Sequence, residues 1–559
     1  MKPTGRFKGY TMIAFRKDLV SGLIVGVIAI PLGMAFAIAS GVKPEYGIYT
    51  TIVAGILISL LGGSKFQIGG PTGAFIPVLL AIVLQYGYEN LLIAGFLAGI
   101  LLVLMGIFRL GTLIRFIPKP VTIGFTAGIA IIIFSGQIAN FLGLRDIAKH
   151  EDFFSNMKEI AIHLPTFNGY SILTACICLV ILLLCSRFMP KIPGALIGLI
   201  VSSVVATLLF NGEVATIAST FGPIPNTLPH FQWPSLTWEK IEMMLIPACI
   251  IAMLGGVESL LSALVADEMT GTRHNSNREL IGQGIANMVT PLFGGIPATG
   301  AIARTATNIK NGAVSPMSGI IHGFIVLLVL LLLAPYASLI PLASMAPILM
   351  MVAWNMSERK EFVRILKTKT NDSIILLVTF LLTVFTTLTI AVGIGLILSV
   401  LWFVKRMSDL NTVYEMPSNH SAKQVKVKAL MDADSRELHH MNIYTIEGPL
   451  FFGTALPLEE SILGNLHHKS KILLLQMGKV PYIDTTGAAH LDRLIGHVVK
   501  SGGVVLLSEI GQQPLSILER TGLLQRVGRD HVFGHTSEAI EFAIKRPARI
   551  RYAESTAMK

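Results

Sequence analysis

Long runs of apolar residues recur between Leu19 and Val404, separated by short segments rich in glycine, proline and charge. A helix that crosses a bilayer needs about 20 apolar residues, and a span with its connection takes roughly 25 to 30. This region of about 385 residues therefore accommodates about fourteen spans, several of them short or interrupted. We expect spans to begin near Leu19, Tyr46, Pro71, Leu91, Pro120, Ser171, Pro193, Ile241, Glu279, Ala301, Pro316, Leu342, Ser373 and Ala391.

The basic residues between the apolar runs indicate how the spans are oriented. Cytoplasmic loops carry an excess of Lys and Arg, so the richer set of loops is predicted to lie inside, with both chain ends cytoplasmic. The richer set holds Lys65, Arg109, Arg115, Lys119, Arg187, Lys191, Arg273, Arg278, Lys310, Arg359, Lys360, Arg364, Lys367 and Lys369. The poorer set holds Lys43, Arg145, Lys149, Lys158 and Lys240.

Composition agrees with a membrane protein and disfavours several other classes. Hydrophobic residues make up 52% of the 559 residues and charged residues 14%, whereas soluble domains carry about 25% charged residues. The net charge of +11 could suggest a nucleic-acid partner, but the basic residues lie in loops between spans, so we expect none. The four cysteines lie within apolar runs, which predicts neither a disulfide framework nor a metal site.

Two similar glycine and proline motifs lie 225 residues apart, Gly69–Ala74 and Gly294–Ala301. Each opens a short apolar segment, and such pairs in the two halves of a transporter point to its binding site. A half-helix that begins inside the membrane has free N–H groups and a partial positive charge at its start. We therefore predict seven plus seven inverted spans and an anion site between two half-helix ends. The alternative is that both motifs are kinks used for helix packing.

Two charged residues lie close to these motifs in the predicted topology. Glu258 is the acidic residue of an otherwise apolar run from Ile246 to Val265, where a carboxylate costs roughly 2.5–3.5 kcal/mol to insert. It could hold a coupling proton, coordinate Na⁺, or form a structural ion pair with Arg304. Arg304 follows the second motif and could bind an anion or extend its side chain to the cytoplasmic surface.

After Lys405 and Arg406 the pattern changes to short β-branched runs that alternate with helical patterns. Strands are predicted at 443–446, 472–475 and 504–507, and helices at 457–465, 486–500, 515–523 and 537–545. Alternation of this kind is typical of a small α/β domain. The segment Gly448–Gly453 lacks the lysine of a phosphate-binding loop, so nucleotide hydrolysis is not expected.

The chain resembles the SulP (sulfate permease) anion transporters from Phe15 to about Lys545. The segment Ala266–Gly284 resembles the loop that follows the family's eighth span. The second glycine motif resembles the start of the family's tenth span. Gly448–Gly453 and Val480–Gly487 resemble the signatures of a STAS domain. Within the family, Met351–Glu358 and Ala29–Ala37 are most similar to bacterial C4-dicarboxylate transporters.

This resemblance implies a core domain, spans one to four and eight to eleven, that moves against a gate domain. It places the anion between the third and tenth half-helices and the coupling ion at Glu258. The implied substrate-binding residues are Phe36, Thr72, Gly73, Ala74, Phe75, Thr299, Gly300, Ala301 and Arg304. In related domains, the turn that corresponds to Asp484–Gly487 is a phosphorylation site, so the resemblance makes Thr486 a candidate regulatory site. The simpler interpretation is that this turn only caps a helix.

Two positions depart from the family pattern. Many members have Gln after the proline of the first span, where this chain has Leu32, so one polar contact to the anion is missing. Sodium-coupled bicarbonate members have Asp at the position of Glu258, and the longer side chain favours coupling to H⁺ over Na⁺. The predicted function is proton-coupled uptake of C4-dicarboxylates such as succinate, fumarate or aspartate. The alternatives are a sulfate or bicarbonate transporter and, less favoured, a passive anion channel.

The remaining expectations concern organisation and partners. We expect a cytoplasmic N-terminus (1–18), a transport domain (19–405), a linker (406–435), a STAS domain (436–550) and a tail (551–559). The protein should be a homodimer in the bacterial inner membrane, and its STAS domain could bind a cytoplasmic regulatory protein. No enzyme activity and no cofactor are expected. His274 and Asp267 could imitate an acid–base pair, but no nucleophile accompanies them, so a turn capped by Asn275 is favoured.

Overall fold

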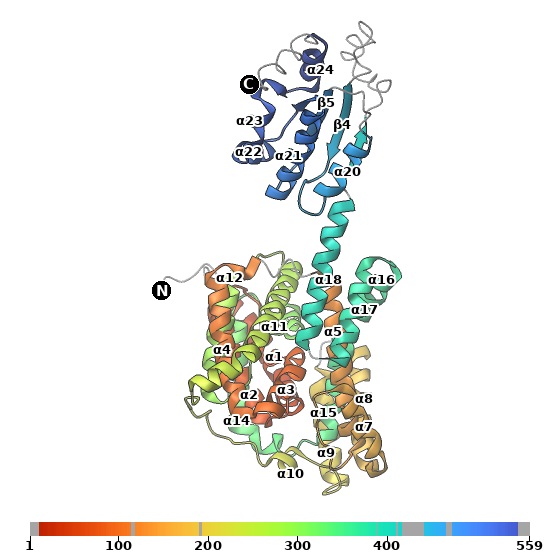
Figure 1. The fold of residues 1–559 in the computed structure, drawn as a ribbon. Helices are drawn as coiled ribbons and strands as arrows, with labels where there is room; N and C mark the ends of the chain where they lie inside the picture. Colours follow the sequence, from red (N-terminus) through yellow and green to blue (C-terminus); the bar gives the residue numbers. More distant parts are fainter. Residues whose placement is uncertain are drawn as a thin grey trace. The chain divides into compact units, whose positions relative to one another are not determined.

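The computed structural model describes residues 10–112, 118–188, 193–386, 388–409, 412–415, 441–465 and 472–545. The chain divides into two compact units, Met1–Ser399 and Val400–Lys559, named here the membrane unit and the tail unit (Figure 1). Residues 1–9, 416–435 and 551–559, which belong to the expected N-terminus, linker and tail, lie outside the described residues. Each unit is described separately.

Each of the fourteen apolar segments expected from the sequence corresponds to one helix, in chain order. The helices are α1 (Met12–Ala39), α2 (Pro44–Leu61), α3 (Ile76–Tyr86), α4 (Tyr88–Ile107), α5 (Lys119–Gly136), α8 (Gly169–Phe188), α9 (Gly194–Leu209), α11 (Trp238–Thr270), α12 (Ser276–Val289), α13 (Ile302–Lys310), α14 (Met317–Ala337), α15 (Leu342–Met356), α17 (Asn371–Phe385) and α18 (Leu388–Asp409). Short helices α6 (Ile138–Leu142), α7 (Phe153–Ile162), α10 (Ile217–Phe221) and α16 (Arg359–Lys367) lie between them. Within the described residues, seven helices are long and apolar enough to cross a membrane.

The order of the helices confirms the predicted internal repeat. Shifted by the expected 225 residues, α1, α2, α3 and α4 fall on α11, α12, α13 and α14. Their contacts are reciprocal, because α1 packs against α14 as α11 packs against α4, and α2 packs against α14 as α12 packs against α4. Reciprocal contacts are what a two-fold relation between repeats produces. This arrangement agrees with the inverted topology expected from the sequence.

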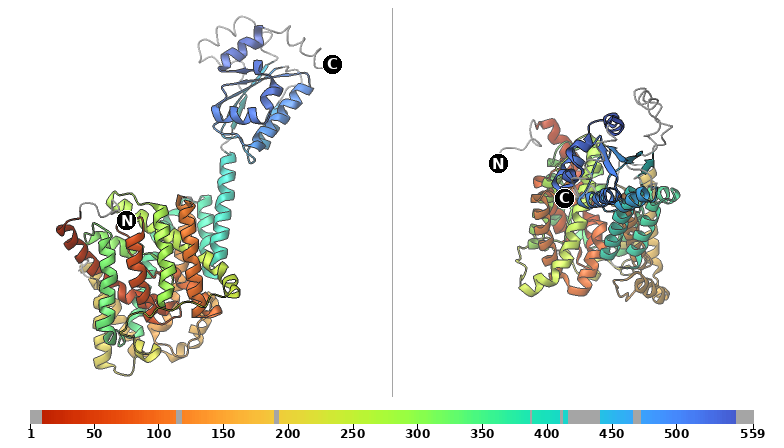
Figure 2. Two further views of the ribbon diagram at one scale, coloured as in Figure 1. Left: turned by 90° about the vertical axis from the view of Figure 1, so that its left-hand side faces the viewer. Right: turned by 45° about the horizontal axis from the view of Figure 1, so that its top comes forward.

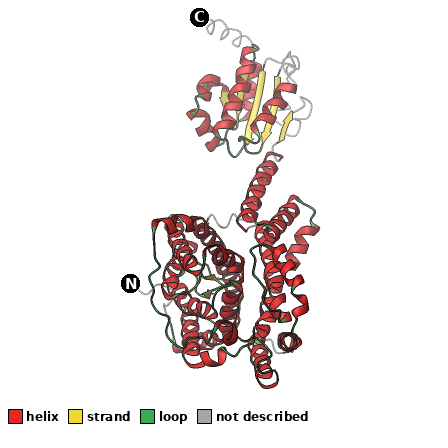
Figure 3. Cartoon of the chain, turned by 60° about the horizontal axis from the view of Figure 1, so that its bottom comes forward, coloured by secondary structure: helices red, strands yellow, loops and turns green. Residues whose placement is uncertain are grey.

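The helices of the membrane unit form two groups (Figure 3). The first helix group contains α1–α4 and α11–α14, and the second contains α5, α8, α9, α15 and α17. Contacts between the groups are fewer and run mainly through α1 with α15 and α9, and through α3 with α5. The first group contains the eight spans that the resemblance implied for the core domain, and the second contains five of the six spans left for the gate domain.

Glycines allow the helices of the first group to approach closely. A Cβ atom added at Gly99 of α4 would lie 2.6 Å from the Met288 nitrogen and 2.7 Å from the Gly284 oxygen of α12. Added at Gly284, it would lie 2.6 Å from the Gly99 oxygen. Small residues have this role in membranes because no hydrophobic effect drives two helices together there and close packing must stabilise the contact.

The tail unit contains one five-stranded sheet in the order β3-β4-β5-β6-β7. The strands are β3 (Thr412–Glu415), β4 (Met441–Glu447), β5 (Ile472–Lys479), β6 (Val504–Ser508) and β7 (Val532–Phe533); β3 is antiparallel to β4 and the others are parallel. The helices are α20 (Ala455–Asn465), α21 (Thr485–Lys500), α22 (Gln512–Arg520), α23 (Leu523–Val527) and α24 (Thr536–Lys545). The three strands and four helices expected from the sequence are therefore present.

Helices lie on both faces of the sheet in the tail unit (Figure 2). Alternating residues of the strands contribute to one apolar cluster on each face. Tyr444, Leu475 and Leu507 face the layer that contains α20 to α23. Ile443, Leu474 and Leu506 face α24. Both faces of the sheet are covered, which explains why these strands read as continuous apolar runs rather than as an alternating pattern.

We predict that Gly99→Ala destabilises the membrane unit by about 1–3 kcal/mol, because the new methyl group overlaps the α12 backbone. The matched control is Gly136→Ala at the end of α5, where an added Cβ meets nothing within 4 Å. Thermal unfolding of the full chain in detergent measures both variants. Equal melting temperatures for the two would contradict the close-packing argument.

The acid stability of the tail unit should depend on Glu509. Burial alone would raise the pKa of its carboxyl, but hydrogen bonds from Gln476 Nε2 (2.9 Å) and the Thr536 hydroxyl (2.7 Å) hold that pKa below its ordinary value. Because the folded-state pKa is lower than the unfolded-state pKa, the carboxylate stabilises the fold near neutral pH, and this contribution is lost as the pH falls through the folded-state pKa.

We therefore expect hydrogen-exchange protection of the β6 amides in the intact chain to fall on acidification. In Glu509→Gln, protection should be lower at neutral pH and should change less with acid. The control is Glu519→Gln, whose exposed carboxyl lies on α22. If Glu509→Gln and Glu519→Gln behave alike, the assigned role of Glu509 is wrong.

Candidate anion-binding site

The structure brings the two glycine motifs together inside the first helix group (Figure 3). Strand β1 (Gly69–Gly70) pairs antiparallel with β2 (Thr299–Gly300), and Gly69 lies opposite Gly300. The Ala301 amide extends the pairing by donating to the Ile68 carbonyl at 2.8 Å. The first half-helix, a 3₁₀ turn at Gly73–Phe75 followed by α3, and the second half-helix, α13, begin directly after these strands.

Both half-helices begin without a side-chain cap. The N-cap residues are Thr72 before the 3₁₀ turn and Ala301 before α13, and neither side chain accepts a hydrogen bond from the following turn. The first N–H groups of each half-helix therefore have no side-chain partner there, and the helix dipoles add partial positive charge. Two such ends side by side form a favourable place for an anion.

The first half-helix lies at the boundary between the two helix groups. A Cβ atom added at Gly73 would lie 3.4 Å from Ile133 Cδ1, 3.6 Å from Met356 Sδ and 3.7 Å from Phe36 Cε1. Phe36 belongs to α1, whereas Ile133 and Met356 belong to α5 and α15 of the second group. Ala74 packs in the same apolar cluster as Phe36. A solute bound at Gly73 would therefore contact both groups.

Two other predicted positions lie in apolar surroundings. The buried Phe75 belongs to a cluster with α11 and α4, and its ring lies 3.1 Å from a Cβ atom added at Gly255. It therefore does not share the cluster of Phe36 and Ala74. Leu32, where many family members have Gln, packs against the cluster of Phe36.

Glu258 lies on α11 next to the first half-helix. Its Oε2 atom accepts a hydrogen bond from the Thr72 hydroxyl at 2.8 Å. The neighbouring Ser259 fixes α11 to β2, because its hydroxyl lies 2.7 Å from that of Thr299 and accepts from the Gly300 amide at 3.1 Å. The carboxylate is thereby held at a defined position beside the half-helix end.

Arg304 is buried, with 3% of its surface exposed. Its Nη2 donates to the Pro71 carbonyl, and its Nη1 has no hydrogen-bond partner among the described residues. No ion pair within 4.0 Å joins it to Glu258 in the described part of the chain. Arg304 therefore does not extend to the surface, and the suggested direct ion pair with Glu258 is not formed.

Sequence reasoning missed two polar side chains near this centre. Gln67 and His322 are buried, and within the described residues their side-chain nitrogen and oxygen atoms have no hydrogen-bond partner. A Cβ atom added at Gly300 would overlap Gln67, and one added at Gly55 would lie 3.1 Å from His322 Nδ1. A histidine within the apolar run of α14 was the signal that could have revealed this polar interior.

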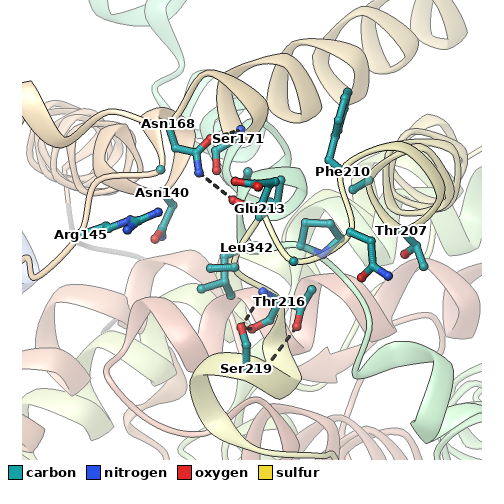
Figure 4. A pocket seen from close by; sticks show the side chains of 18 of the residues that line it. Asn140, Arg145, Asn168, Ser171, Thr207, Phe210, Glu213, Thr216, Ser219 and Leu342 are labelled. Atoms are coloured by element: carbon teal, nitrogen blue, oxygen red, sulfur yellow. Dashed lines mark hydrogen bonds between the residues drawn. The ribbon is translucent and has the colours of Figure 1, made fainter.

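A cavity of about 470 Å³ lies elsewhere, among the ends of α6, α8, α9 and α15 (Figure 4). Its lining includes Asn140, Arg145, Asn168 and Glu213, and Asn168 Nδ2 donates to the Glu213 carbonyl at 2.7 Å. Charges of both signs line it and no half-helix begins there. We therefore assign the anion site to the half-helix ends rather than to this cavity.

The remaining predicted features have structural roles. Asn275 caps α12 as expected, accepting from the Arg278 amide at 3.0 Å. His274 Nδ1 lies 2.6 Å from Asp267, and the His274 side chain is 1% exposed, so this pair orders the loop between α11 and α12. In the tail unit, Asp484 caps α21 by accepting from the Gly487 amide at 2.7 Å, and Thr486 is exposed on the first turn.

Comparison with known proteins gives consistent matches. Residues 15–379 match the sequence model of the Sulfate permease family, and residues 432–539 match that of the STAS domain. The chain is 57% identical to "Putative sulfate transporter YvdB" of Bacillus subtilis over 96% of this chain and 99% of that protein. It is 29% identical to "Bicarbonate transporter BicA" of Picosynechococcus sp., over 95% and 94% of the two chains. The solved structure of SLC26A9 has the same fold, with a TM-score of 0.84 at 20% identity over 96% of this chain and 91% of that one.

We predict that Gly70→Ala destabilises the crossing, the name used here for the place where β1 (Gly69–Gly70) pairs with β2 (Thr299–Gly300) and the two half-helices begin. Gly70 has a φ of +151°, and a Cβ atom there would lie 2.7 Å from Arg304 Nη1. Gly87→Ala is the control, because Gly87 also has a positive φ of +83° but an added Cβ meets nothing within 4 Å. Backbone strain alone is worth about 1–3 kcal/mol, so Gly70→Ala should lower the melting temperature further than Gly87→Ala. An equal loss in both would show that Arg304 does not require the glycine.

Proposed function

Since the chain belongs to the sulfate permease family of anion transporters and carries a STAS domain, we propose that it moves sulfate or bicarbonate across the membrane by secondary active transport. The observation that carries the proposal is the pair of uncapped half-helix ends, the first of which lies at the boundary between the two helix groups. Backbone N–H groups and one guanidinium can bind a small oxyanion, and movement of one helix group against the other can expose it on either side.

The expected preference for C4-dicarboxylates is not supported. The compared relatives are named for sulfate and bicarbonate, although the family and the STAS domain are as expected from the sequence. Physical chemistry favours the same choice, because a dicarboxylate has two separated charges. Arg304 is the cationic side chain that lies against the two glycine motifs, and a dicarboxylate would need a second positive contact for its distal carboxylate. Sulfate and bicarbonate need only one such contact.

We propose that Glu258 carries the coupling proton. It is the acidic group beside the anion site, and it accepts a hydrogen bond from Thr72 at the start of the first half-helix. Binding a proton would remove a negative charge from the neighbourhood of the anion, so proton and anion would favour each other's binding. Na⁺ is the alternative coupling ion, since a carboxylate and nearby hydroxyl oxygens can also hold a cation.

The placement in the membrane remains part of the proposal. The bias of Lys and Arg between the two sets of loops favours cytoplasmic ends for both termini, as in a bacterial inner-membrane transporter. We further propose a homodimer in which the STAS domain supports assembly or regulation, with Thr486 as a modification site because it is exposed on α21. Transport chemistry itself needs only the membrane unit.

Uptake of radiolabelled sulfate, bicarbonate and succinate into proteoliposomes tests the proposal. With an inward H⁺ gradient, the wild-type protein should accumulate sulfate or bicarbonate. Under the same gradient, Glu258→Gln should accumulate at least about tenfold less anion than the wild type, because its side chain cannot carry the proton. The control is Glu242→Gln, an exposed carboxyl on the same helix α11, which should transport like the wild type.

Each other outcome has a definite meaning. Accumulation that follows only a Na⁺ gradient would contradict the choice of proton. Uptake of succinate alone would contradict the choice of substrate class. If folded wild-type protein moves none of the three anions, the transport proposal itself fails.

A further inference from the structure

The Thr72 hydroxyl occupies a position that would normally cap a helix. Thr72 is the N-cap residue of the Gly73–Phe75 turn, and its backbone is extended, with φ −130° and ψ 159°. In this geometry a threonine oxygen usually accepts a hydrogen bond from an amide of the first turn. Here it accepts none from the turn and donates instead to Glu258 Oε2 at 2.8 Å. The residue thus connects the acidic group directly to the end of the first half-helix.

We infer that Thr72 is the element that couples proton binding to anion binding, by reversing the direction of its hydrogen bond with Glu258. This inference rests on the proposed function. A hydroxyl has one hydrogen to donate and two lone pairs to accept, whereas an ionised carboxylate only accepts. While Glu258 is charged, the single Thr72 hydrogen is directed to Oε2 and is not available to a solute.

Protonation of Glu258 changes this arrangement. A proton from water on the open side of the site binds a carboxyl oxygen of Glu258, and the neutral acid then has an O–H of its own to donate. It donates to Thr72 Oγ1, so the Thr72 hydrogen is released and can turn toward an anion at the Gly73 and Ala74 amides. The anion gains one hydrogen bond and loses a neighbouring negative charge. On the other side of the membrane, loss of the proton to water restores the first state and weakens anion binding.

The groups around Glu258 leave Thr72 as the hydroxyl free for this role. Ser259 is engaged with Thr299 and Gly300, and Ser262 donates to the Thr305 hydroxyl at 3.1 Å. Thr72 is the side chain that donates a hydrogen bond to Glu258 in the described part of the structure.

Other ionisable groups on the elements packed against α11 do not compete for the carboxyl. Arg304 on α13 acts on it electrostatically but is bound to the Pro71 carbonyl. On α4, Tyr88 donates to the Gly294 carbonyl at 2.6 Å, and on α12, Glu279 accepts from the Gly63 amide at 2.7 Å. Lys310 lies at the last turn of α13, away from the half-helix start.

The test is equilibrium binding of radiolabelled sulfate to the purified full chain between about pH 8 and about pH 5, over which the charge of sulfate stays constant. In the wild type, affinity should rise about tenfold on acidification, the effect of one hydrogen bond to an anion. Thr72→Ser keeps the hydroxyl and should keep this rise. Thr72→Val replaces the hydroxyl by a methyl group of similar size and should reduce the rise to less than about threefold.

Glu258→Gln supplies an independent readout. Its amide N–H can donate to Thr72 as a protonated carboxyl would, so at pH 8 this variant should bind sulfate with the affinity that the wild type has in acid. Thr72→Val combined with Glu258→Gln should lose that gain, because the hydroxyl that transmits it is absent. If Thr72→Val does not fold, Thr72→Ala, which also lacks the hydroxyl, replaces it in both comparisons.

The outcomes separate this inference from the proposed function. Full pH dependence in Thr72→Val, or weak binding by Glu258→Gln at pH 8, would overturn the inference while sulfate binding itself stands. If folded wild-type protein binds no sulfate at any pH, the proposed function fails for this anion, and the inference fails with it.

Discussion

The antiparallel pairing of Gly69–Gly70 with Thr299–Gly300 is the interaction on which the rest of the membrane unit depends. It joins two chain segments from opposite repeats and uses backbone groups that would otherwise be unpaired in an apolar interior. Because each strand ends at the start of a half-helix, the same few hydrogen bonds place two positive helix ends side by side. The reciprocal packing of α1 on α14 and α11 on α4 surrounds this crossing with closely packed helices.

Some polar groups at the crossing stabilise the structure, and others are assigned to anion binding and coupling. Arg304 is held by the Pro71 carbonyl and keeps one nitrogen unpaired in the described structure. Ser259 fixes α11 to β2, and Glu258 is hydrogen-bonded to Thr72 at the start of the first half-helix. Selectivity for small oxyanions follows from a site made mostly of backbone N–H groups, and coupling follows from one carboxyl and one hydroxyl.

The sequence was sufficient for the fold because its signals were local or periodic. Apolar runs predicted the fourteen segments, the 225-residue echo of glycine motifs predicted the crossing, and β-branched runs predicted the sheet of the tail unit. Glu258 and Arg304 were found because charge within an apolar run is costly. Side-chain pairing could not be predicted, since it depends on rotamers and distances across repeats: the Thr72 to Glu258 contact, the Arg304 to Pro71 contact and the unpaired Gln67 and His322 are examples. The sequence of the site does not specify the substrate either, because a site built mostly from backbone N–H groups requires few particular side chains.

The most direct test of the account is the position of a bound anion. Selenate has the shape and charge of sulfate, and selenium can be located by anomalous diffraction from crystals of the full chain grown with selenate. The account predicts a selenium peak within hydrogen-bond distance of the amides at the starts of both half-helices, after Thr72 and after Ala301. A peak confined to the cavity between Asn140 and Glu213, with none at the half-helix ends, would contradict the assignment of the site.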